Sequence, residues 1–329
     1  MVQTDNEVAT EVAQGLTPSM SSNATIVVTG VGGFIGGFLA CELARQGYRV
    51  IGTARDIESV PLVVTQSCQK LVRVVINGAT DWSPVLPQSS AVIHCAAHVH
   101  VRRPSKRDLQ LFRQVNVEGV RALSRGCRDH NVSLLLNLSS IAASALPTDE
   151  KSIGYGLSKH DAELVIGDVL LESNCRYVNL RLPAVYGPGA KGALGFLFWL
   201  VNSGLPLPLL SKSVKRSYLS VWNLLDCITH CLDRRPDRNV TVAIADDPAL
   251  DLSDLIYTMG KSVRKSPRFI NLGAGPLAFA ALLAGRRGEF QRGMVESVIS
   301  PAEAHRALGW TPQVTAEEAW ARMASRDPR

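Results

Sequence analysis

Short apolar runs rich in β-branched residues alternate along this chain with segments of helical length. Each run is typical of a buried strand. Six runs predict strands, at Thr25–Thr29, Arg49–Thr53, Leu71–Ile76, Ala91–His94, Ser133–Leu138 and Tyr177–Leu182. Alternation of strands and helices is typical of βαβ units, in which helices cover both faces of a parallel sheet. We therefore predict an α/β fold built on a doubly wound parallel sheet.

The regular alternation ends after Pro183 and gives way to loops rich in glycine and proline, followed by isolated helices. We predict a first domain over residues 24–183, to which residues 219–246 return, and a smaller C-terminal lobe over residues 184–329. Residues 1–23 are polar and lack hydrophobic periodicity. They predict a disordered tail or, because Met20 precedes the first strand, a misassigned start.

The composition is that of a globular protein of 329 residues, with 46% hydrophobic and 19% charged residues. Its seven cysteines show no CxxC spacing, which argues against a disulfide framework and against a metal site. No apolar stretch reaches the roughly 20 residues that span a bilayer, and no secretory pattern opens the chain. A cytoplasmic location is therefore expected.

The formal charge of +6 is densest between Arg102 and Arg107. A solvated face explains such a cluster, and so does attraction of phosphorylated ligands or a peripheral contact with anionic lipid. Aromatic residues make up only 6% of the chain, and no nucleic-acid recognition motif is present. Nucleic acid is therefore disfavoured as a partner.

A glycine-rich turn follows the first predicted strand and precedes a predicted helix over Phe38–Gln46. It is Gly30-Val31-Gly32-Gly33-Phe34-Ile35-Gly36. Glycines at 30, 33 and 36 permit a tight turn and close approach of a pyrophosphate to the amino end of the helix. The turn predicts dinucleotide binding and makes the predicted sheet one of Rossmann type.

The end of the second strand selects between NAD and NADP. An acidic residue there binds the ribose of NAD, whereas an arginine accommodates the additional phosphate of NADP. The acidic position holds Ala54 and is followed by Arg55. This favours NADP, with NAD as the alternative if Arg55 only pairs with Asp56 or solvent.

A third element places Ser139 and Ser140 at the end of a strand, followed by Tyr155-Gly156-Leu157-Ser158-Lys159. At a spacing of four, Tyr155 and Lys159 share one helix face, so the ammonium is expected to lower the pKa of the phenol. Such a phenol exchanges a proton with a carbinol oxygen while hydride moves to or from a nicotinamide. Ser140 is expected to hold that oxygen.

Together these motifs resemble the extended short-chain dehydrogenase/reductases, in the nucleotide-sugar epimerase and reductase branch. The resemblance covers residues 24 to about 324 and includes HCAAHVHV, NVEG, LRLPAVYGPG, KRSYLSVWNL and LGWTP. It implies a UDP-sugar substrate and a homodimer formed through helices that flank the sheet.

The resemblance also implies roles for individual residues. The cofactor would contact Gly30, Gly33, Phe34, Ile35, Gly36, Arg55, Cys95, Ala96, Ala97, Tyr155, Lys159, Pro183 and Val185. The catalytic set would be Ser140, Tyr155 and Lys159, with Asn116 beneath it. Arg216 would clamp the diphosphate of the sugar nucleotide, and no metal is implied.

Three departures from the family pattern bear on the reaction. Ile141 and Ala142 replace the Asp-Glu pair of sugar 4,6-dehydratases, which disfavours dehydration. Gly78, with Asn77 beside it, replaces the acid that often holds the adenine. Ala143, Ser144 and Ala145 replace the usual VYG near the nicotinamide.

Position 297, thirteen residues before Trp310, resembles the gate of UDP-hexose 4-epimerases. A residue as small as Ser297 would admit an N-acetyl group there, although a turn residue before a helix near Ala302 is an equal interpretation.

Other features are more simply structural. His98 and His100 are expected as loop histidines rather than substrate contacts, and Cys227 and Cys231 as core residues. The apolar stretch 272–285 predicts a helix of the C-terminal lobe or a subunit contact, with a helix on a membrane surface as the alternative.

The function expected first is reduction of a UDP-4-keto-6-deoxy-N-acetylhexosamine by NADPH. A 4-epimerase of UDP-hexoses or UDP-N-acetylhexosamines, which retains NAD, is the alternative. A cofactor-sensing regulatory protein is disfavoured by the intact Tyr155 and Lys159. A reductase of apolar ketones is disfavoured by Arg216, since such a substrate has no diphosphate.

Overall fold

The computed structural model describes residues 23–99, 105–144, 150–190, 192–205, 207–208, 214–270 and 296–325. The chain divides into two compact units. The first comprises the residues up to Arg181 together with Cys227–Val242, and the second comprises Leu182–Asp226 and the residues from Ala243 onward.

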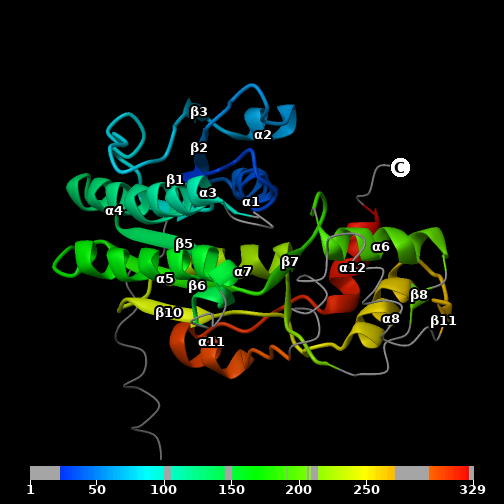
Figure 1. Ribbon diagram of the computed structural model, residues 1–329. Helices are drawn as coiled ribbons and strands as arrows, with labels where there is room; N and C mark the ends of the chain where they lie inside the picture. Colours follow the sequence, from blue (N-terminus) through cyan, green and yellow to red (C-terminus); the bar gives the residue numbers. More distant parts are fainter. Residues whose placement is uncertain are drawn as a thin grey trace, which may run out of the picture. The chain divides into compact units, whose positions relative to one another are not determined.

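A seven-stranded sheet in the order β10-β6-β5-β4-β1-β2-β3 forms the centre of the first unit (Figure 1). Its strands are β1 (Thr25–Thr29), β2 (Arg49–Ala54), β3 (Lys70–Arg73), β4 (Ala91–His94), β5 (Leu134–Ser140), β6 (Arg176–Leu182) and β10 (Val240–Ala243). β1 pairs in parallel with both β2 and β4, and the pairs β2–β3 and β4–β5 are also parallel. The predicted α/β fold with a doubly wound sheet is confirmed.

Helices follow the strands in alternation. They are α1 (Phe34–Arg45), α2 (Leu62–Ser67), α3 (Lys106–Leu111), a π-helix (Phe112–Glu118), α4 (Gly119–Asp129), a 3₁₀ turn (Ile141–Ala143), α5 (Glu150–Leu170) and α7 (Val221–Asp233), which begins in the second unit. α1 packs against α2, and α4 packs against α5.

The core under α4 and α5 follows from strand periodicity, because successive side chains of a strand point to opposite faces. Val27, Val92 and Leu135, on three neighbouring strands, join one buried cluster with Leu123 of α4 and Ile166 of α5. Their neighbours in sequence, such as Ile26 and Leu134, are also fully buried. Both faces of the central strands are therefore covered.

Several predicted boundaries differ from the structure by one or two residues, and those of the third strand and the first helix differ by more. The third strand, expected over Leu71–Ile76, ends at Arg73 because its partner β2 ends at Ala54, the residue opposite Arg73. Thr80 then donates to the Val75 carbonyl and accepts from Asn77, which turns the chain. α1 begins four residues before the predicted helix, immediately after Gly33.

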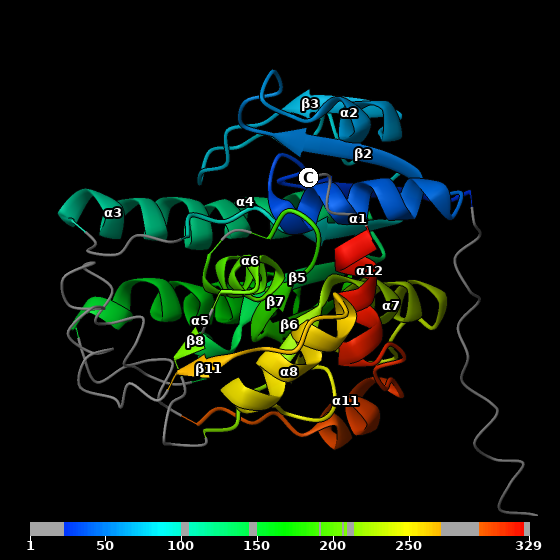
Figure 2. The ribbon, with the colours of Figure 1, turned by 90° about the vertical axis from the view of Figure 1, so that its right-hand side faces the viewer.

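The second unit contains two short parallel pairs, β7 (Ala184–Tyr186) with β9 (Tyr218–Ser220) and β8 (Leu207–Pro208) with β11 (Phe269–Ile270). Its helices include α6 (Ala193–Ser203), α8 (Leu252–Ser262), α11 (Pro301–Leu308) and α12 (Ala316–Ser325). α8 packs against α6 and α12 (Figure 2).

Aromatic stacking fills the core of this unit. The ring of Trp320 lies 4.3 Å from that of Tyr186 and 5.3 Å from that of Phe198. The Tyr186 hydroxyl donates to the buried Asp246 carboxylate at 2.8 Å. Among the described residues of the whole chain, no helix is both long and apolar enough to cross a membrane.

Candidate active site

The glycine turn after β1 has no space for side chains at two of its positions. Gly30 has φ +73°, and a Cβ there would lie 2.9 Å from the Ala96 Cα. A Cβ on Gly36 would lie 2.4 Å from the Gly30 carbonyl oxygen. These positions therefore give the tight turn and the close helix packing that are typical of a pyrophosphate-binding cradle.

The amino end of α1 is suited to an anion. Phe34 and Ile35 form its first turn, Gly33 precedes it without a side-chain cap, and the first turn contains no acidic residue. Amide donors and the helix dipole at such an end favour a phosphate. These residues fit the dinucleotide that the sequence predicts.

Thr29 connects the end of β1 to the segment after β4. Its Oγ1 accepts from the amides of Cys95 and Ala96 at 3.1 and 3.2 Å and bonds the Nδ1 of His94 at 2.8 Å. Burial lowers the pKa of His94 to about 3 and raises that of Cys95 to about 12. Cys95, Ala96 and Ala97 thus offer an uncharged surface beside the Gly30 turn.

The carboxyl ends of β2 and β3 carry two exposed arginines. Arg55 follows β2 directly, and Arg73 is the last residue of β3. The Nε of Arg73 donates to the Arg55 carbonyl at 3.2 Å. Over the described ranges no carboxylate pairs with either guanidinium, and Asp56 accepts the Glu58 amide instead. No local pattern in the sequence marks Arg73, because only the β2–β3 register brings it beside Arg55.

The segment after β3, where Gly78 and Asn77 replace the adenine-binding acid of the family pattern, makes its own turn. Asn77 Oδ1 accepts the Ala79 amide at 2.8 Å, and Gly78 is exposed.

Three side chains on one face of α5 contact three consecutive residues of β5. Tyr155 is hydrogen-bonded to the side chain of Ser140. The Nζ of Lys159 donates to the Leu138 carbonyl at 2.8 Å. Glu163 accepts from the Ser139 hydroxyl. The structure therefore brings Ser140, Tyr155 and Lys159 together and places Glu163 beside them.

The close approach of α5 to the end of β5 depends on Gly156. A Cβ at this position would lie 2.6 Å from the Ala142 carbonyl oxygen. Ala142, which replaces an acidic residue of the dehydratases, lies in the 3₁₀ turn with Ile141, and its amide donates to Ser140 Oγ at 3.2 Å. The turn thereby orients the Ser140 hydroxyl.

Burial governs the protonation of the two ionisable groups. Burial raises the pKa of the Tyr155 phenol, and the bond with Ser140 opposes that rise. Burial also lowers the pKa of Lys159 to about 8, and the Glu163 carboxylate opposes that fall. The expected lowering of the tyrosine pKa by Lys159 is not found, because the ammonium is directed to the Leu138 carbonyl and is itself desolvated.

Asn116 lies in the π-helix, a conformation that is frequent at functional sites. Its Nδ2 donates to Ser158 Oγ and to the His98 carbonyl, both at 3.0 Å, and its Oδ1 accepts the His98 amide at 2.7 Å. Asn116 therefore joins the segment after β4 to α5 through Ser158, which lies between Tyr155 and Lys159.

His98 is packed rather than free. Its ring centre lies 5.0 Å from that of Phe112, and its Nε2 lies 3.6 Å from Asp108 Oδ1. His100 lies outside the described residues.

The second unit brings together two predicted substrate residues that are distant in sequence. The Arg216 amide donates to the Leu250 carbonyl at 2.9 Å. Ser297 pairs in parallel with Arg216. The Ser297 carbonyl accepts from the Ser217 amide at 2.8 Å, and the Ser297 amide donates to the Lys215 carbonyl at 3.2 Å. Arg216 and Ser297 thus form one bridge.

The other residues named from the sequence are placed as follows. Pro183 is buried, and Val185 pairs with Leu219 between β7 and β9. Cys227 and Cys231 are buried on α7. The apolar stretch 272–285 lies outside the described residues.

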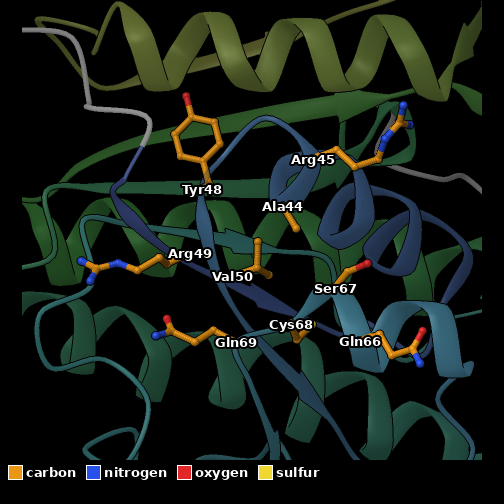
Figure 3. A pocket seen from close by; sticks show the side chains of 9 residues that line it. All are labelled: Ala44, Arg45, Tyr48, Arg49, Val50, Gln66, Ser67, Cys68 and Gln69. Atoms are coloured by element: carbon orange, nitrogen blue, oxygen red, sulfur yellow. The ribbon is translucent and has the colours of Figure 1, made fainter.

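A cavity of about 570 Å³ lies in the first unit at the amino ends of β2 and β3 (Figure 3). The side chains around it include Arg45, Tyr48, Arg49 and Cys68, and the first two are committed to Glu42 and Asp233. No residue that the sequence predicts as functional lines it. Since the glycine turn follows the carboxyl end of β1, this cavity is separate from the candidate active site.

Comparison with protein families matches residues 26–244 to the NAD dependent epimerase/dehydratase family. Among curated relatives, a UDP-glucose 4-epimerase of Vibrio cholerae is 27% identical over 91% of this chain and 94% of its own. A ceramide reductase of Caulobacter vibrioides is 27% identical over 61% of this chain and 58% of its own.

Solved structures with the same fold include the UDP-N-acetylglucosamine 4-epimerase from Bacillus cereus, with a TM-score of 0.69 at 20% identity. The alignment covers 92% of this chain and 95% of that one. At this identity the likeness concerns the fold.

The matched segment contains the glycine turn, Ser140, Tyr155 and Lys159, which are the residues that carried the resemblance. The prediction of an NAD(P)-dependent enzyme of the extended short-chain dehydrogenase/reductase type is thereby confirmed. The chain belongs to the NAD dependent epimerase/dehydratase family.

Proposed function

We propose that this enzyme uses NADPH to reduce a UDP-4-keto-6-deoxy-N-acetylhexosamine at carbon 4. The observation that carries the proposal is the contact of Tyr155 with Ser140 on the strand that Lys159 also binds. It is supported by Arg55 and Arg73 at the ends of β2 and β3, with which no carboxylate of the described residues pairs. Bound NADPH supplies the hydride.

Tyr155 is the proton donor in this proposal. Because burial raises its pKa, the phenol is protonated at neutral pH and can release its proton to the carbon-4 oxygen as the hydroxyl forms. Ser140 orients that oxygen through its hydroxyl, which is itself oriented by the Ala142 amide. Lys159, held at the Leu138 carbonyl, supplies positive charge beside the site.

Arg55 and Arg73 support the choice of NADP. Two guanidinium groups without a paired carboxylate can share a phosphate through charge-assisted hydrogen bonds. A carboxylate that would bind the ribose of NAD is missing at Ala54.

The substrate side of the proposal rests on the second unit. Arg216 would bind the diphosphate of the UDP group, and its neighbour Ser297 would admit an N-acetyl group because its side chain is small. The UDP-N-acetylglucosamine 4-epimerase from Bacillus cereus, which has the same fold, supports such a substrate. A homodimer and a cytoplasmic location stay predictions.

A 4-epimerase is the second candidate. The Vibrio cholerae UDP-glucose 4-epimerase aligns over most of both chains, and the same tyrosine and serine would serve it. An epimerase retains its oxidised cofactor through the reaction, so this alternative requires tightly bound NAD rather than exchangeable NADPH.

Two assays on the purified enzyme separate the candidates. Loss of NADPH absorbance at 340 nm upon addition of a UDP-4-keto-6-deoxy-N-acetylhexosamine, with none upon addition of UDP-GlcNAc, is the expected result. Interconversion of UDP-GlcNAc and UDP-GalNAc without added cofactor would instead establish the epimerase.

A further inference from the structure

Glu163 is a buried carboxylate for which the proposed reaction has no direct use. Its side chain is 6% exposed, and it lies one helical turn beyond Lys159 on the same face of α5. A buried charge is costly unless it is paired and hydrogen-bonded. The partners of Glu163 therefore indicate what the charge does in the fold.

Two groups neutralise and hold Glu163. Arg181 of β6 binds it through Nε, at 3.1 Å to both carboxylate oxygens, and through Nη2 at 2.6 Å. The Ser139 hydroxyl donates to the same carboxylate. The Nη1 of Arg181 also donates to Ser144 Oγ at 3.0 Å. The pair thus ties α5 to both sides of the strand end that contains Ser140.

Three side chains of α5 hold three successive residues of β5. Lys159 binds Leu138, Glu163 binds Ser139, and Tyr155 binds Ser140, so each successive residue of the strand is held by a different turn of α5. Glu163 therefore holds the residue that lies between Leu138 and Ser140 on the strand. Ser140 is the serine that holds the substrate oxygen.

Glu163 is also the anionic group that faces the Lys159 ammonium. The other titratable groups close to this ammonium are His94, the last residue of β4, and Cys95, which follows it. Both are neutral, because burial lowers the pKa of His94 and raises that of Cys95. Tyr155 lies one turn earlier on α5. The Arg181 guanidinium binds Glu163 directly, so its cation is expected to offset part of that attraction.

We propose that Glu163 and Arg181 are positioning residues of the active site: the carboxylate keeps Lys159 charged and fixes the strand end at Ser140, and the guanidinium limits that effect. The proposal rests on the proposed function only for the identity of the reaction. The charge state of Lys159 is measurable without any substrate.

Matched substitutions of Glu163 and Arg181 should move the pH at which Lys159 loses its proton in opposite directions. In Glu163→Gln the anion is lost and the cation of Arg181 remains, so Lys159 should lose its proton at lower pH than in the wild type. In Arg181→Gln the anion faces Lys159 without a competing cation, so Lys159 should lose its proton at higher pH. Glu42→Gln, which removes a surface partner of Arg45 on α1, is the control and should change neither.

The direct readout is the ¹³Cε resonance of Lys159 in lysine-labelled full-length protein, assigned by its absence in Lys159→Met and followed from pH 6 to 11. The wild-type midpoint should lie near 8. We expect displacements of roughly one pH unit in opposite directions in the two variants, since a nearby charge shifts a pKa by about one to three units.

Equal loss of thermal stability with an unchanged Lys159 midpoint in both variants would overturn the proposal and leave a structural ion pair. If either variant fails to fold, the double variant Glu163→Gln/Arg181→Met removes both charges. Its Lys159 midpoint should lie closer to the wild-type value than that of the single variant that folds, and a midpoint equal to that of the single variant would contradict the proposal. If the protein bound neither NADPH nor NADH, that result would count against the proposed function and not against this inference.

Discussion

The side chains of Tyr155 and Ser140 are hydrogen-bonded to each other, although one lies on a helix and the other at the end of a strand. The contact places the proposed proton donor beside the hydroxyl that would hold the substrate oxygen. It also limits the rise in the pKa of the phenol that burial causes. Chemistry at a carbonyl needs both groups at one oxygen, and the structure supplies them together.

Replacing Tyr155 by phenylalanine should remove the proton donor and leave the cofactor cradle intact. We expect turnover to fall by about 10²- to 10⁴-fold, the range typical of general acid catalysis. Steady-state rates and NADPH fluorescence titration check the two parts separately. Near-normal turnover would show that another group donates the proton. The fall should be smaller in Ser140→Ala, where the donor remains.

Replacing Arg55 or Arg73 by alanine should weaken binding of NADPH and leave binding of NADH unchanged. Loss of one charge-assisted hydrogen bond to the phosphate corresponds to about a 10- to 100-fold increase in Kd. Titration by cofactor fluorescence at fixed ionic strength measures both affinities. Arg49→Ala is the matched control, because Arg49 is an exposed arginine at the other end of β2. Equal losses for NADPH and NADH would mean that the arginines do not recognise the additional phosphate.

Replacing Gly36 by alanine tests the cradle. Helix propensity alone would stabilise this position by up to about 1 kcal/mol. The new Cβ, however, would lie 2.4 Å from the Gly30 carbonyl oxygen, so we expect a lower Tm and loss of dinucleotide binding. Gly32→Ala is the control, since its Cβ would lie 3.7 Å from the nearest atom, a methyl group of Val60. An equal or higher Tm for Gly36→Ala would contradict the close approach of the turn.

The buried His94 should make the protein sensitive to mild acid. Its pKa is about 3 in the fold and 6.5 in the unfolded chain, because burial and the Lys159 ammonium disfavour the imidazolium. Between these values the unfolded chain binds more protons, so stability present above pH 6.5 is lost as the pH falls towards 3.

Urea denaturation of the wild type and of His94→Asn, which can still accept from Thr29, measures this effect. From pH 6.5 to pH 5 the free energy of unfolding of the wild type should fall by about 1.5 kcal/mol more than that of the variant. Parallel losses in the two proteins would show that other groups are responsible.

Much of this fold follows from local sequence patterns. β-branched runs mark β1 and β4 at their observed limits, because both strands are buried on both faces and end at turns. The glycine turn is recognisable because strand, glycines and helix follow one another without interruption. Such features can be predicted because each depends only on residues that are close together in the sequence.

Other features depend on register and packing between distant segments. Arg73 becomes a partner of Arg55 only through the pairing of β3 with β2, and Arg216 meets Ser297 only through a bridge in the second unit. The pKa of Tyr155 depends on how deeply α5 buries it, which overrides the influence of Lys159 expected from their spacing. None of these relationships has a local signature.

The cofactor is the most direct test of the account, because exchangeable NADPH and retained NAD correspond to different reactions. The protein would be purified, an aliquot denatured, and the released nucleotides identified by mass spectrometry, while the native protein is titrated with NADPH and NADH. The account predicts an empty site and tighter binding of NADPH than of NADH. Release of stoichiometric NAD, without preference for NADPH, would contradict it and indicate the epimerase.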